Sequence, residues 1–367
     1  MPRYNPRVKP QSADTASGQD REPQLAVWEF AGLLLTYGCD ARCAFCYVSA
    51  GPGHRGYMDL ATTLALWRSL DELAAQHGKS MRIHLSGGEP FRDWVRLTSL
   101  VRAVRDAGLT PLEKIETNAS WATDDGLTRA RLELLDALGL GKLAVSTDVF
   151  HQEFVPLERV RRCVEIGRRV LGRDRVIVRR WDFLRRPVEV RELSPAQRED
   201  AFRQALARYK DRLSGRAAMQ LARLLPGRPA EAFQGQSCTM EVLQSRHVHV
   251  DLHGHIFPGT CVGIILGRAT GDFTIVDAWH QLALNWRLHS VVAAVVAGGS
   301  YELLQRARCF GYCELPGGYA SKCHLCTHIR QYLFDRGLWR EFVGPQECYA
   351  PALACFMDPD TRAAASR

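Results

Sequence analysis

Two hydrophobic patterns alternate along the first half of the chain. Short apolar runs predict buried strands, and segments with apolar residues three and four positions apart predict helices. Strand–helix units of about 30 residues are typical of parallel sheets with right-handed crossovers, so we predict an α/β fold. The predicted strands cover residues 25–36, 81–85, 112–117, 143–145 and 175–178, and the predicted helices cover residues 59–73, 94–107, 125–138 and 157–170.

The pattern changes after Ser194, where an Ala-, Arg- and Leu-rich helical stretch runs to about Leu225 and is broken by Pro226-Gly227-Arg228-Pro229. A strand at 247–251, a hairpin into a second strand and a helix at 328–342 follow. In the first of these strands, His247 and His249 point the same way, and we interpret them as an exposed strand face rather than a metal site. The predicted organisation is a flexible tail (1–24), a barrel (25–228), a cysteine-rich domain (229–357) and a C-terminal tail (358–367).

Composition narrows the class of protein. The chain has 367 residues, a net charge of +8 and twelve cysteines. Residues 1–23 have no apolar core, and the apolar run at 291–297 is far shorter than the roughly 20 residues that span a membrane. We therefore expect a cytoplasmic protein without a membrane partner, whose clustered thiols bind metal rather than form disulfides. No basic run is interleaved with aromatic residues, so a nucleic-acid partner is not expected.

Three cysteines dominate the candidate chemistry. Cys39, Cys43 and Cys46 form a CxxxCxxC loop directly after an apolar run. Three thiolates on one short loop can hold three corners of an iron–sulfur cube and leave the fourth iron open to an outside ligand. The alternatives are a zinc knuckle or unpaired buried thiols. Zinc usually needs four nitrogen or sulfur ligands, and no fourth cysteine lies close by in the sequence.

A second motif follows the predicted strand at 81–85. Two glycines at a strand end let the backbone approach a ligand without interference from a Cβ atom. This Gly-Gly-Glu-Pro motif and the cysteine loop, with its aromatic residue before the last cysteine, together resemble the radical S-adenosylmethionine (radical SAM) enzymes. The resemblance implies a partial (β/α)6 barrel and a [4Fe–4S] cluster whose open iron takes the amino and carboxylate groups of SAM. The residues that carry it are Phe45, Gly87, Gly88, Glu89 and Pro90.

The resemblance also implies roles at other strand ends. Phe45 would pack near the adenine, Asn118 and Ser146 would contact the ribose or the carboxylate of SAM, and Arg179 or Arg180 would bind that carboxylate. For Asn118 and Ser146 the structural alternative is turn or helix capping. Two further residues that follow a strand end, Asp148 and His151, are candidates to face the substrate, although a histidine there can also be a satisfied loop residue.

A second set of cysteines follows the predicted boundary. A cysteine, a strand, a glycine turn and a proline near another cysteine resemble the start of the SPASM or twitch extensions, which hold auxiliary iron–sulfur clusters. We predict one auxiliary [4Fe–4S] cluster on Cys238, Cys261, Cys323 and Cys326, although the spacing departs from the SPASM pattern. Two alternatives stay open: two clusters that also use Cys309, Cys313 and Cys348, or a zinc site on Cys309, Cys313, Cys323 and Cys326. Cys163 is interpreted as a buried thiol.

The function implied is reductive cleavage of SAM to a 5′-deoxyadenosyl radical that abstracts hydrogen from a substrate. Such an enzyme needs an electron donor such as flavodoxin or ferredoxin. Extensions of this kind recur in enzymes that modify ribosomally made peptides, so a peptide is the leading substrate and a small molecule the alternative. A different class remains, a non-enzymatic iron–sulfur or zinc-binding protein in redox sensing or assembly. The Gly-Gly-Glu-Pro motif argues against it, because a bare metal-binding module needs no site for SAM.

Overall fold

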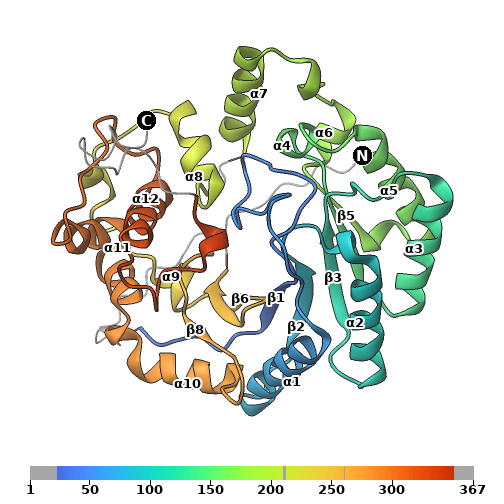
Figure 1. Cartoon of the computed structure of the whole chain (residues 1–367), viewed down its shortest axis with the longest axis horizontal. Coiled ribbons are helices and arrows are strands. Elements are labelled where there is room, and N and C mark those ends of the chain that lie inside the picture. Colours follow the sequence, from blue (N-terminus) through green and yellow to red (C-terminus); the bar gives the residue numbers. More distant parts are fainter. Residues whose placement is uncertain (1–22, 210–211, 260, 351–367) are drawn as a thin grey trace, which may run out of the picture.

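One eight-stranded sheet organises the molecule (Figure 1). The computed structural model describes residues 23–209, 212–259 and 261–350, so the predicted tails fall almost wholly outside the described residues. The strand order is β5-β4-β3-β2-β1-β6-β7-β8. The strands are β1 Phe30–Leu34, β2 Arg82–Ser86, β3 Leu112–Thr117, β4 Lys142–Ser146, β5 Val176–Arg179, β6 His247–Asp251, β7 His255–Pro258 and β8 Gly267–Arg268.

The strands β1 to β6 are parallel, and β7 and β8 are antiparallel additions beyond β6. The predicted α/β class and all five strands of the first half are therefore confirmed. The sixth parallel strand, β6, pairs with β1, on the side opposite β2. The sheet is thus continuous across the boundary predicted at residue 228, and its parallel strands come from both sides of that boundary.

Helices surround the strands (Figure 1). Where the sequence predicts helices in the first half, the structure has α1, α2, α3 and α5, and Asp59 caps α1 by accepting a hydrogen bond from the Thr62 N–H. The α-helices are α1 Leu60–Gln76, α2 Trp94–Asp106, α3 Asp125–Ala137, α4 Val149–Gln152, α5 Leu157–Val170, α6 Trp181–Arg185, α7 Pro195–Arg208, α8 Arg216–Gln220, α9 Thr239–Val242, α10 Ile275–Asn285, α11 Ser290–Arg308 and α12 Lys322–Asp335. The 3-10 helices are η1 Pro90–Asp93, η2 Arg173–Arg175, η3 Val190–Glu192, η4 Ala222–Leu224, η5 Ala230–Phe233, η6 Trp286–Leu288 and η7 Gln346–Cys348.

Two helix predictions in the second half were wrong in their bounds. The helical stretch expected from Ser194 to Leu225 is divided into α7 and α8, with Gly215 at a φ of +56° just before α8. A Cβ atom on Gly215 would lie 2.3 Å from the carbonyl oxygen of Tyr47, so contact with the cysteine loop fixes the break. The helix expected at 328–342 begins earlier, where Ser321 caps α12, and ends at Asp335.

The two faces of the sheet differ in chemistry because successive side chains of a strand point to opposite faces. The outer face is aliphatic and fully buried, with Ala31, Leu33, Ile83, Leu85, Ile115, Leu143 and Val145. The inner face is polar, and the strand register places Gly32, His84, Ser86, Lys114, Glu116, Ser146, Arg179, His247 and His249 on it. Polar chemistry is thus gathered inside the curve of the sheet.

The apolar helices of the C-terminal half pack within the molecule. Helix α10 contacts α1, and α11 contacts α12. Across the described ranges, no single helix is long and apolar enough to span a membrane. Residues Ile275–Leu288 and Ser290–Arg308 are so only when taken together, and these two helical segments meet at an angle of 58°.

Candidate functional site

The three cysteines of the loop line one cavity of about 180 Å³ at the carboxyl ends of the parallel strands. Ligands of parallel sheets bind at this edge. Most of the predicted site residues line the same cavity, although they come from five separate segments of the chain. They are Cys39, Cys43, Phe45, Cys46, Gly87, Gly88, Asn118, Ser146, Asp148, His151 and Arg179, together with Arg180.

The two glycines after β2 pack against the cysteine loop. The Gly88 N–H donates to the Thr36 carbonyl at 2.6 Å, and the Glu89 N–H donates to the Gly38 carbonyl at 2.9 Å. A Cβ atom on Gly87 would lie 2.5 Å from the Thr36 oxygen, and one on Gly88 would lie 2.0 Å from the Gly38 oxygen. The sequence suggested that glycine here admits a ligand. The structure adds that glycine lets β2 hold the base of the loop.

Glu89 and Pro90 do not line the cavity. The Glu89 carboxylate is completely buried and accepts hydrogen bonds from the chain itself. Its donors are the Asn118 N–H at 2.7 Å, the Thr117 hydroxyl at 2.8 Å and the Phe91 N–H at 3.2 Å. Burial raises the pKa of Glu89 to about 7, although these hydrogen bonds lower it. Glu89 therefore joins the end of β2 to the end of β3, beside the cavity.

Two of the loop thiols, those of Cys39 and Cys46, accept hydrogen bonds from neighbouring N–H groups. The Asn118 side-chain amide donates to Cys39 Sγ at 3.4 Å, as does the Ala41 N–H, and the Ala50 N–H donates to Cys46 Sγ at 3.3 Å. Asn118 also accepts a hydrogen bond from the Ser120 N–H at 2.8 Å, so it is a turn residue as well. Burial raises the pKa of both Cys39 and Cys46. A positively charged metal group reverses such a shift and holds thiolates, so the donor set fits one.

Asp148 and His151 form a pair at the cavity wall. Asp148 caps α4, and its carboxylate lies 2.8 Å from His151 Nδ1. Burial opposes protonation of His151, but Asp148 and Cys43 raise its pKa well above its usual value. His151 is therefore held beside the loop by the Asp148 carboxylate.

Arg179 ends β5 and Arg180 follows it, and both arginines line the cavity. Arg179 forms an ion pair with Glu116 of β3. Arg180 lies with its guanidinium 3.9 Å from the centre of the Tyr209 ring and 6.0 Å from that of Phe45. Phe45 itself stacks on Phe150, with 5.1 Å between ring centres. A cation and a flat apolar surface thus lie side by side.

A family model decides the identity of this part of the chain: residues 33–173 match the model of the Radical SAM superfamily. Residues 33–173 are a radical SAM domain. The prediction of a radical SAM domain, and with it that of an enzyme, is confirmed for these residues. The family uses a [4Fe–4S] cluster and SAM, and the three thiols and the strand ends around this cavity fit both groups. No curated protein that was compared matches the chain.

Solved structures of distant relatives resemble the chain weakly. BtrN in complex with AdoMet and 2-DOIA is 18% identical, over 74% of this chain and 89% of that one, with a TM-score of 0.43. Native anSMEcpe with bound AdoMet and Cp18Cys peptide is 14% identical, over 84% and 97%, with a TM-score of 0.39. Streptococcus suis SuiB bound to precursor peptide SuiA is 12% identical, over 82% and 76%, with a TM-score of 0.36. At this level of similarity their ligands do not identify the substrate of this chain.

Arg216 supports the cysteine loop of the radical SAM domain from outside the matched residues. Its guanidinium donates to the carbonyl oxygens of Cys43 at 3.0 Å, Ser49 at 2.7 Å and Ala50 at 2.6 Å. Sequence analysis missed this residue because it placed Arg216 inside one long helix. The break before α8, which Gly215 marks, was the available signal.

Replacing Arg216 with methionine is expected to weaken both the loop and cluster assembly. The substitution keeps an apolar stem but removes the donors to three loop carbonyls. One hydrogen bond to a charged group contributes about 1.5–3 kcal/mol, and bonds that share one guanidinium are not additive. We expect a loss of about 2–3 kcal/mol in the free energy of unfolding and less iron after reconstitution. Arg223→Met is the control, because Arg223 is an exposed arginine that forms an ion pair with Glu199. Equal iron in the two variants would contradict the supporting role of Arg216.

The second cysteine set also converges. Cys238 before α9, Cys261 after β7, and Cys323 and Cys326 in the first turn of α12 line one cavity. Burial, reinforced by the neighbouring thiols, raises the pKa of Cys238 and Cys323 to about 12. In contrast, Cys309 and Cys313 are exposed and do not line this cavity, which removes the basis for a zinc site that includes them. Cys348 lies elsewhere, 3.5 Å from the Tyr37 hydroxyl, Cys163 is buried as expected, and Cys355 is outside the described residues.

The double variant Cys323→Ala/Cys326→Ala is expected to lose the auxiliary metal and to keep the metal that the cysteine loop binds. Total iron would fall by about four atoms per chain, the content of one cube. Iron and acid-labile sulfide are measured together with zinc. A wild-type protein that holds one zinc and loses only that zinc in the variant would contradict an auxiliary cluster.

Proposed function

We propose that the chain binds a [4Fe–4S] cluster on Cys39, Cys43 and Cys46, binds SAM beside it, and abstracts hydrogen from a substrate, with a ribosomally made peptide as the leading candidate. One observation carries the proposal: the three thiols and the polar residues of four strand ends share one cavity. When bound, the cluster and SAM supply an electron and a 5′-deoxyadenosyl radical.

The side chains of this chain would bind and orient SAM and the substrate. Arg179 and Ser146, at neighbouring strand ends, suit the carboxylate and the ribose of SAM, because guanidinium binds carboxylate through two parallel hydrogen bonds. Phe45 offers a flat surface to the adenine, backed by Phe150. Asn118 orients Cys39 through its amide. His151, held by Asp148, lines the same cavity and is our candidate to position a polar group of the substrate.

What supports a peptide substrate is the four-cysteine cavity of the C-terminal half, because it resembles the SPASM and twitch extensions. The four cysteines also favour an auxiliary [4Fe–4S] cluster there. The electron donor we propose is a flavodoxin or a ferredoxin. The net charge of +8 on this chain would favour the approach of an acidic carrier.

The test is anaerobic reconstitution followed by incubation with dithionite and SAM. The expected product is 5′-deoxyadenosine together with methionine, quantified by chromatography and mass spectrometry. Short peptides encoded beside the gene are then added, and a mass change in one of them identifies the substrate class. A fully reconstituted protein that releases no 5′-deoxyadenosine would instead support a non-enzymatic iron–sulfur protein.

A further inference from the structure

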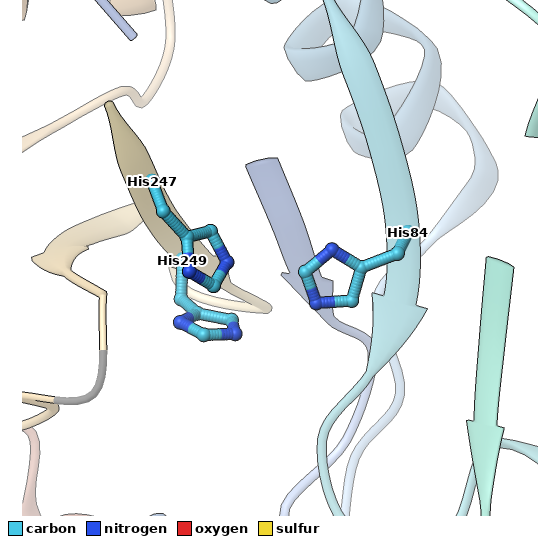
Figure 2. Close-up of side chains that lie close together, drawn as sticks. All are labelled: His84, His247 and His249. Carbon is cyan, nitrogen blue, oxygen red and sulfur yellow. The ribbon is translucent and has the colours of Figure 1, made fainter. Parts of the chain in front are cut away.

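Three histidines meet on the inner face of the sheet, apart from both cysteine sets. His84 belongs to β2, and His247 and His249 belong to β6. Both strands pair with β1, which lies between them. Figure 2 shows the rings of His247 and His249 facing the ring of His84 across β1. One ligand atom from each residue lies within 4.8 Å of those of the other two.

Gly32 makes this meeting possible. The register places Gly32 of β1 opposite both His84 and His249. A Cβ atom on Gly32 would lie 2.4 Å from His249 Cδ2 and 2.6 Å from His84 Nε2, so any other residue would push the two rings apart. The sequence-based interpretation of His247 and His249 as an exposed face was wrong. It placed these residues in a separate domain, whereas β6 is inside the sheet and His249 is 2% exposed.

The hydrogen bonds leave an acceptor nitrogen on each ring for a ligand. His249 Nδ1 lies 2.6 Å from the Gly259 carbonyl oxygen and donates to it, which leaves Nε2 as an acceptor, and Nε2 lies 3.3 Å from the Tyr47 hydroxyl. A backbone carbonyl that fixes the ring in this way is typical of metal-binding histidines. Within the described part of the chain, the buried atoms His84 Nδ1 and His247 Nε2 have no hydrogen-bond partner. Unsatisfied polar atoms are rare in a buried position, and His84 is only 1% exposed.

The charges around the histidines favour neutral rings. Burial lowers the pKa of all three, and Lys114 and Arg179 contribute in the same direction. Neutral imidazole is the form that binds metal. One carboxylate partly offsets the two cations, because Glu116 pairs with the Lys114 ammonium at 2.7 Å and also with Arg179. The same carboxylate lies 3.9 Å from His84 Nε2, so its negative charge is next to the site as well.

We propose that His84, His247 and His249 bind one divalent transition-metal ion of the zinc class. Three imidazoles are a known ligand set for such ions and leave a fourth position for water or another oxygen donor. The Tyr47 hydroxyl, 3.3 Å from His249 Nε2, is such an oxygen donor. Tyr47 follows Cys46 in the chain and lines the same cavity as Cys39, Cys43 and Cys46. The ion would therefore lie directly behind the wall of that cavity.

Cobalt is the probe that separates this site from the cysteines. Co²⁺ is added to the reconstituted, desalted wild-type chain, and its visible spectrum and stoichiometry are recorded. We expect one Co²⁺ per chain in a nitrogen–oxygen site, without a thiolate-to-cobalt charge-transfer band, and displacement by Zn²⁺. No binding above the level of a buffer control, or binding with thiolate bands alone, would overturn the proposal.

Variants locate the ion. His247→Ala and His249→Phe are each expected to weaken Co²⁺ binding by more than the roughly 10- to 100-fold that loss of an outer-shell partner costs. His280→Ala is the matched control, because His280 is exposed and belongs to α10. Iron content reports whether each variant folds. If His249→Phe loses its iron, the half-buried His247→Ala decides the outcome, and unchanged Co²⁺ affinity in that variant would refute the site. The metal readout does not depend on SAM cleavage, so failure here leaves the proposed function standing.

Discussion

Replacing Cys39, Cys43 and Cys46 together with alanine will remove about four iron atoms per chain and abolish formation of 5′-deoxyadenosine. These three thiols are the cysteines that line the cavity at the carboxyl ends of the parallel strands. No other thiol in the described residues can therefore take their place there. The iron bound by the C-terminal set should remain, because those four cysteines line a separate cavity. Iron analysis and product chromatography measure the two effects.

The double variant Cys309→Ala/Cys313→Ala is the control for this experiment. Both cysteines are exposed and outside both cavities, so iron and product should match the wild-type values. If the triple variant keeps its iron, the cysteine loop does not hold a cluster. If the control loses as much iron as the triple variant, the assignment of ligands is wrong.

Gly88→Ala will destabilise the fold around the loop, whereas Gly53→Ala will not. The added methyl on Gly88 would lie 2.0 Å from the Gly38 carbonyl oxygen, far inside van der Waals contact, and Gly88 has no flexible side chain as its neighbour to yield. The end of β2 and the base of the loop must then separate, which breaks the hydrogen bond from the Gly88 N–H to Thr36. We expect a loss of about 3–5 kcal/mol, at the severe end for one substitution.

Gly53 provides the matched comparison because a Cβ atom there meets nothing within 4 Å and its φ is not positive. Urea unfolding of the cluster-free chains gives the difference in stability, and iron uptake reports the shape of the loop. If Gly88→Ala unfolds at the same urea concentration as Gly53→Ala, the close packing of β2 on the loop is not what Gly88 provides.

Local patterns predicted most of the first half of the sheet. Each strand there is a short apolar run, and the helix that follows it has apolar residues three and four positions apart, so both elements can be recognised from neighbouring residues alone. The α5 bounds of Leu157–Val170 and the β3 bounds of Leu112–Thr117 were predicted without error. The cysteine loop and strand-end residues were also predictable, since parallel strands place their carboxyl ends along one edge. Their convergence on one cavity needed no long-range information beyond that rule.

The rest depended on contacts between distant segments. Pairing of β6 with β1 joins residues more than two hundred positions apart, and no local pattern encodes it. That pairing turned His249 from an expected surface residue into a buried one. Similarly, Arg216 reaches the cysteine loop only because the chain breaks at Gly215. Burial of Glu89 against the end of β3 was equally invisible in a motif of four residues.

The most direct test of a cube held by three thiolates uses the Cys323→Ala/Cys326→Ala variant, which leaves the loop as the remaining proposed cluster site. Its dithionite-reduced form is examined by electron paramagnetic resonance with and without SAM. We predict a reduced [4Fe–4S] signal that changes when SAM is added, because one iron has no protein ligand and can bind it. A signal that SAM leaves unchanged, or the lack of any cluster signal in this variant, would contradict an open iron at Cys39, Cys43 and Cys46.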